Sequence, residues 1–95
     1  MAYVTVSRWH YDDRLDESAL RRSAEDKLTQ LKAMGASAGH LVRTGPSEGL
    51  VVVIYPDEGA WNRVRDFVHR MRAETHPATG GQVVEAAQGP ALVSV

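Results

Sequence analysis

Hydrophobic and polar positions follow two different periods along this chain. Residues 3–10 alternate and are rich in β-branched and aromatic types, which predicts a strand. Residues 50–55 are apolar at every position, which is typical of a strand covered on both faces. Shorter runs of the same residue types predict further strands at 39–45, 82–87 and 91–95.

Apolar residues at helical spacing predict a first helix over residues 17–34. Asp16 can cap its first turn, and Gly35 provides a C-terminal stop. The apolar stripe that this helix buries comprises Leu20, Ala24, Leu28, Leu31 and Met34.

A second helix is predicted over residues 58–74. Asp57 can cap it, and Pro77 with the Gly80-Gly81 pair should end it. About 100° of rotation per residue places His69 on the solvent side of this helix, while Trp61 borders the core. Its apolar stripe comprises Ala60, Val64, Phe67, Val68 and Met71.

The predicted order is β-α-β-β-α-β with a further C-terminal strand. Two β-α-β halves that share an antiparallel sheet form an α+β, ferredoxin-like βαββαβ sandwich, and residues 1–95 are expected to form a single domain. One helix layer covers only one face of the sheet, whereas residues 50–55 are apolar on both faces. The simplest cover for the second face is another copy of the chain, so we expect a homodimer that pairs as a dimeric α+β barrel.

The terminal segment 91–95, Ala-Leu-Val-Ser-Val, follows Gly89-Pro90 and is predicted to be separated from the strand before it. Such a strand suits the sheet edge of a partner subunit. The alternative is a tail that folds back on its own subunit. The sequence leaves both arrangements open.

Charge and composition exclude several classes of protein. The chain has 11 Lys and Arg against 12 Asp and Glu, so it lacks the basic excess of a nucleic-acid binder. No apolar run approaches the roughly 18 residues of a membrane helix, and residues 1–6 do not resemble a signal peptide. The absence of cysteine fits a reducing compartment. A cytoplasmic protein without membrane contact is therefore expected.

Candidate polar chemistry is sparse. Arg65 and Arg72 lie seven residues apart on the helix face that carries His69, beside Trp61, and they are candidate contacts for an anion. The alternative is an ordinary solvated helix face. Residues 10–17 combine a histidine with four carboxylates, but their spacing matches no calcium loop or paired-histidine motif, so we expect no metal site.

Four segments carry a family resemblance: the opening strand YVTVSRW, the end of the first helix AMGA, the strand GHLVRT, and the segment VVVIYPDEGAW. Together they resemble the antibiotic biosynthesis monooxygenase-like family of the dimeric α+β barrel superfamily. The last segment is similar to the family's strand that ends in an aromatic residue and leads into an acidic capping turn. The resemblance covers nearly the whole chain.

The resemblance implies a cofactor-independent monooxygenase that acts on a small aromatic or quinol-type substrate. It also implies a pocket between sheet and helices, for which Ser7, Trp9, Tyr55 and Trp61 are the candidate lining residues. The alternative is a non-catalytic module of the same fold that binds a small ligand or serves dimerisation, because fold does not imply function.

The haem-degrading branch of the family is disfavoured residue by residue. That branch uses an asparagine on the first strand, where this chain has Ser7. Its tryptophan and histidine fall near Val64 and Glu74, while Trp61 and His69 are displaced from those positions. We therefore expect no haem and no other cofactor.

Overall fold

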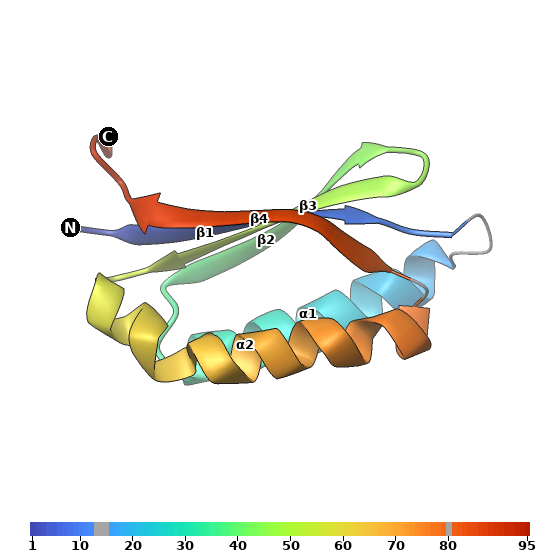
Figure 1. The fold of residues 1–95 in the computed structure, drawn as a ribbon, viewed down its shortest axis with the longest axis horizontal. Coiled ribbons are helices and arrows are strands. Elements are labelled where there is room, and N and C mark those ends of the chain that lie inside the picture. The colour runs from blue at the N-terminus through green and yellow to red at the C-terminus, as the bar shows by residue number, and fades with distance from the viewer. Residues whose placement is uncertain (13–15, 80) are drawn as a thin grey trace.

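The computed structural model describes residues 1–12, 16–79 and 81–95, without the side chains of 75–79. Its strands lie in the order β2-β3-β1-β4 with antiparallel neighbours, and both helices cover one face of the sheet (Figure 1). This confirms the predicted α+β ferredoxin-like sandwich. The elements are β1 (Tyr3–His10), α1 (Glu17–Ala33), β2 (Ala38–Gly45), β3 (Glu48–Tyr55), α2 (Glu58–Thr79) and β4 (Gln82–Pro90).

Helix α1 begins and ends close to the predicted positions. The Asp16 carboxylate accepts a hydrogen bond from the Ser18 backbone N–H at 2.9 Å, which satisfies one free donor of the first turn. Gly35 follows the helix with a φ of 122°, in the left-handed region that favours glycine. The cap and the stop therefore act as the sequence predicts.

Strand β1 has two faces with different surroundings. Thr5, Ser7 and Trp9 are buried on the face that the helices cover, and their register places Ser7 opposite Val51 of β3. Successive side chains of a strand point to opposite faces, so the next positions lie on the uncovered side. That side, called the open face below, carries the half-buried Val4, Val6, Leu50, Val52 and Ile54.

The core lies between β3 and the two helices. Tyr55 is fully buried at the end of β3, and Ala60, Trp61 and Val64 pack against it from α2. One apolar face of strand β3 meets this core, and its other apolar face forms part of the open face. The described residues of a single chain leave the open face without a helix layer (Figure 1).

Two sequence-based predictions about breaks in the chain were wrong. Helix α2 continues through Pro77 and ends at Thr79, directly before the Gly80-Gly81 pair, because the fixed φ of proline is compatible with a helix and Pro77 lies within the last turn. Strand β4 continues through Gly89 and Pro90, because an edge strand tolerates a missing donor. Residues 91–95 form no strand within one chain. They bend to the side of the sheet opposite the helices after Ala91 donates to the Ala2 carbonyl at 2.8 Å (Figure 1).

Candidate functional site

A cavity of about 80 Å³ lies between the covered face of the sheet and the two helices. Strands β1 and β3 form its floor through Ser7, Trp9 and Val53, and α1 and α2 form its roof. Most of the lining is apolar, with a few hydroxyl groups and two basic side chains. The remaining lining residues are Thr5, Tyr11, Leu20, Ser23, Ala24, Lys27, Leu28, Leu31, Leu41, Val51, Tyr55, Val68, Met71 and Arg72.

Ser7 and Trp9 share a hydrogen bond on the cavity floor. The Trp9 indole N–H donates to Ser7 Oγ at 2.8 Å, and both side chains are buried. The Trp9 ring also stacks on Tyr11, with centroids 6.3 Å apart and planes inclined by 10°. Ser7 and Trp9 are both pocket residues predicted from the sequence. The structure brings them together and shows that the Ser7 oxygen already accepts a bond.

Tyr55 contributes a buried hydroxyl without a hydrogen-bond partner among the described residues. Its ring tilts against Trp61 with centroids 5.6 Å apart, so the aromatic part of the side chain is well packed. Burial raises the pKa of Tyr55 to about 12, and the nearby positive charge of Arg72 opposes part of that rise. The hydroxyl therefore stays protonated near neutral pH and is a donor.

Arg72 is half-buried and lines the same cavity as Tyr55. Burial lowers the pKa of Arg72, and the interaction with Tyr55 opposes the fall. Arg65, the other candidate anion contact, is exposed and does not line the cavity. Their seven-residue spacing places the two arginines on related faces of α2, but only Arg72 lies near enough to the core to reach the cavity.

Trp61, the fourth predicted pocket residue, lies in the core and outside the cavity lining. Its ring meets the exposed His69 ring edge-on, with centroids 6.3 Å apart. The predicted solvent side for His69 is confirmed. Trp61 supports the cavity indirectly, because it packs against the ring of Tyr55.

Lys27 of α1 also lines the cavity, although it was not predicted from the sequence. Burial lowers the pKa of Lys27, while Glu74 and Asp26 raise it. The signal was present, because Lys27 lies three residues after Ala24 and four before Leu31, on the apolar stripe of the helix. Among the described lining residues, the charged ones are Lys27 and Arg72, and both are basic.

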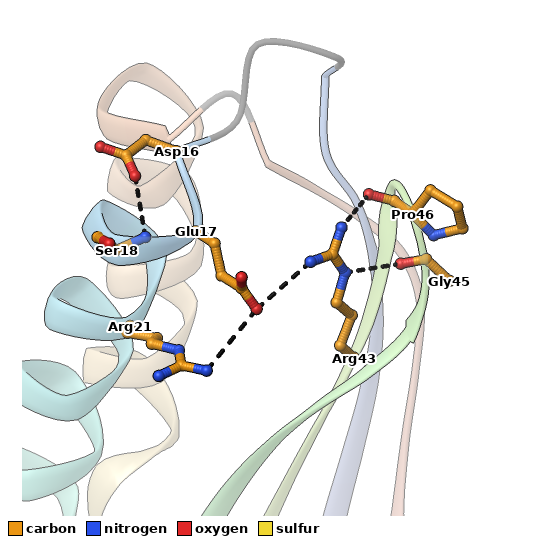
Figure 2. A network of polar contacts seen from close by, with 7 residues as sticks. All are labelled: Asp16, Glu17, Ser18, Arg21, Arg43, Gly45 and Pro46. Atoms are coloured by element: carbon orange, nitrogen blue, oxygen red, sulfur yellow. Dashed lines mark hydrogen bonds and ion pairs between the residues drawn. The ribbon is translucent and has the colours of Figure 1, made fainter.

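A second hollow of about 510 Å³, lined by several charged side chains, lies between the start of α1 and the β2–β3 hairpin. It shares Tyr11, Leu20 and Leu41 with the first cavity, so the two adjoin at these side chains. Glu17 and Arg43 form an ion pair at 3.3 Å across this hollow (Figure 2).

The same network fixes the Arg43 side chain to the hairpin. Arg43 donates to the carbonyls of Gly45 at 3.3 Å and Pro46 at 3.0 Å, and Glu17 also lies 3.9 Å from Arg21 (Figure 2). These side chains are more than half exposed, so each ion pair is worth under about 1 kcal/mol. The network ties α1 to the hairpin but contributes little stability.

Within the described ranges, no group of three His, Asp or Glu side chains is placed to hold a metal ion. Residues 13–15, which belong to the carboxylate-rich segment 10–17, lie outside the described residues. Neither helix, as far as it is described, has an apolar stretch that would cross a membrane.

No protein-family model and no curated protein matches the chain. Solved structures do match it over nearly its whole length. Rv0793 from Mycobacterium tuberculosis has a TM-score of 0.72 at 18% identity, covering 99% of this chain and 98% of that one. A dimeric ferredoxin-like protein from an uncultured marine organism has a TM-score of 0.74 at 9% identity, covering 99% and 98%.

SnoaB, a cofactor-independent oxygenase from Streptomyces nogalater, has a TM-score of 0.69 at 14% identity, covering 99% of this chain and 96% of that one. At such identities a likeness carries the fold and no residue roles. The fold predicted from the sequence is confirmed at that level: this chain has the ferredoxin-like fold that these structures share.

Proposed function

We propose that this protein is a cofactor-independent monooxygenase that acts on a small aromatic or quinol-type substrate in the cavity above β1 and β3. The observation that carries the proposal is the cavity itself, whose apolar lining combines Trp9 and Tyr55 with the hydroxyl of Ser7. The fold shared with SnoaB, a cofactor-independent oxygenase, supports the same chemistry by analogy.

This reaction depends more on how the substrate is positioned than on strongly acidic or basic side chains. An electron-rich substrate reacts with oxygen directly once it is held in a dry, oriented pocket. Aromatic walls such as Trp9 suit a flat ring, and the protonated Tyr55 hydroxyl offers a donor to a substrate oxygen.

The size of the cavity limits the substrate. Pockets for drug-sized ligands hold roughly 300–1,000 Å³, whereas this one holds about 80 Å³. A polycyclic substrate is therefore disfavoured. A single ring requires the flexible side chains at the margin, Lys27 and Arg72, to swing outward.

The functional unit in this proposal is a homodimer. The open face carries Val4, Val6, Leu50, Val52 and Ile54, an apolar surface that water covers in a lone subunit. Structural neighbours with the same strand and helix arrangement are described as dimeric ferredoxin-like proteins. A second copy packed on the open face also lies close to the tail of residues 91–95, whose Leu92, Val93 and Val95 are exposed.

An oxygen-uptake assay tests the catalytic proposal. Hydroquinone, methylhydroquinone and catechol are incubated with the wild type, and uptake is compared with the spontaneous rate in buffer. We expect faster uptake with the wild type, a marked loss in Ser7→Ala and Trp9→Phe, and no change in Arg65→Met, which alters an exposed residue outside the cavity. Uptake equal to the buffer rate, or equal rates in all variants, contradicts the proposal.

A non-catalytic small-ligand-binding module is the second candidate, and one observation favours it. Among the described lining residues there is no histidine or carboxylate to act as a general base, and the Ser7 oxygen is already bonded to Trp9. Ligand binding without oxygen uptake in the same assay supports this candidate over the oxygenase.

A further inference from the structure

One buried hydrogen-bond donor in the lining of the cavity lacks an acceptor among the described residues. Tyr55 is fully buried, and its hydroxyl has no partner among the described residues. Arg72, which is half-buried and basic, lines the same cavity. Leaving a buried donor unsatisfied is costly, and protein structures rarely do so without a reason.

The chemistry of the Tyr55 hydroxyl and the Arg72 guanidinium defines which kind of ligand group can bond to both. A guanidinium group has five N–H donors and no acceptor, and a protonated phenol beside it also donates. Their common partner is therefore an acceptor. Because Arg72 is positively charged and partly removed from water, a negatively charged acceptor balances it best.

The rest of the cavity agrees with a negative ligand. Its charged lining residues, Lys27 and Arg72, are both basic, and no carboxylate lines it within the described part of the chain. Away from these groups the walls are apolar, formed by Leu28, Leu31 and Val53 among others. The lining of the cavity thus combines two basic side chains and a buried hydroxyl with mostly apolar walls.

We infer that the cavity binds a small monocarboxylate, with the carboxylate held by the Tyr55 hydroxyl and the Arg72 guanidinium and a short apolar group among the leucines and valines. A planar carboxylate has two acceptor oxygens, so it can accept hydrogen bonds from a phenol and from a guanidinium at the same time. An engineered apolar cavity of about 150 Å³ binds benzene, so about 80 Å³ suits a branched chain of a few carbons. The inference rests on the cavity of the proposed function being the ligand site, and it does not require oxygenation.

The test is a titration of the ¹⁵N-labelled protein at pH 7 with isobutyrate and with isobutyramide, followed by NMR chemical shifts. The two probes have nearly the same shape and differ in charge. We expect isobutyrate to bind at least about tenfold more tightly than isobutyramide, with shifts at Thr5, Val53 and Tyr55. Benzoate and benzamide, as a larger pair, report whether the cavity opens for a ring.

Variants assign the binding to the two donors. Tyr55→Phe and Arg72→Met are each expected to weaken isobutyrate binding by at least about tenfold while leaving isobutyramide unchanged. Arg65→Met is the matched control on the same helix, and its affinity should stay within about twofold of the wild type. Circular dichroism of each variant verifies that it folds.

The outcomes separate this inference from the proposed function. Equal affinity for the acid and the amide, shifts outside the cavity, or unchanged binding in Arg72→Met overturns the carboxylate site. Oxygen uptake with neutral quinols but no isobutyrate binding overturns the inference and keeps the oxygenase. Isobutyrate binding without oxygen uptake supports the inference and leaves the oxygenase proposal contradicted.

Discussion

Replacing Tyr55 with phenylalanine should stabilise this protein, although it removes a group from the candidate site. The substitution deletes one oxygen and keeps the ring, which packs 5.6 Å from Trp61. The deleted hydroxyl is fully buried and has no partner among the described residues. An unsatisfied buried polar group costs about 1–3 kcal/mol, so we expect the free energy of unfolding to rise by about 1–2 kcal/mol.

The assay is urea denaturation at a fixed protein concentration, because dimerisation makes apparent stability depend on concentration. In a domain of this size, 1 kcal/mol also raises the melting temperature by about 4–8 °C. Tyr3→Phe is the matched control, since Tyr3 is half-exposed and pairs with Tyr55 in the sheet register. Its stability should change by less than about 0.5 kcal/mol.

The difference between wild type and Tyr55→Phe should also depend on pH. Burial raises the folded-state pKa of Tyr55 to about 12, above the ordinary value of 10.0. Below pH 10 both states hold the proton. Between pH 10 and 12 the unfolded chain loses its proton first, so the wild type loses about 2–3 kcal/mol that the variant keeps. The claim that the Tyr55 hydroxyl is buried and unpaired is refuted if Tyr55→Phe is less stable than the wild type. It is also refuted if the difference in unfolding free energy between the two does not grow above pH 10.

Three further predictions concern other elements. Asp16→Ala should lower the free energy of unfolding by about 1 kcal/mol through loss of the 2.9 Å cap bond, whereas Asp26→Ala in the exposed helix interior should cost less in the same denaturation. Glu17→Gln should change the melting temperature by only about 2–4 °C, because its ion pairs with Arg21 and Arg43 are exposed; a larger shift contradicts this. Val52→Asp on the open face should convert a dimer into a monomer, as measured by light scattering, whereas the control Arg65→Asp on α2 should leave the dimer intact. A wild type that is monomeric at micromolar concentration contradicts the proposed homodimer.

The sequence by itself determined the order of elements and the faces they bury. Alternation in β1 and helical spacing in α1 and α2 are local consequences of backbone geometry, so they can be recognised from the sequence alone. The caps at Asp16 and Gly35 are equally local. Breaks were predicted less well, because whether Pro77 or Pro90 interrupts an element depends on which of its backbone groups need a partner.

Only the tertiary structure decided which candidate residues meet. Ser7, Trp9 and Tyr55 share a cavity, whereas Trp61 lies behind the ring of Tyr55 in the core. Arg65 and Arg72 are the same residue type and lie seven positions apart on α2. Only Arg72 lines the cavity that Tyr55 also lines. Such distinctions depend on how α2 lies across the sheet, since a rotation of a fraction of a turn exchanges core and solvent positions. The Tyr55 hydroxyl lacks a partner because of how residues distant in the sequence pack around it, so no pattern along the chain predicts it.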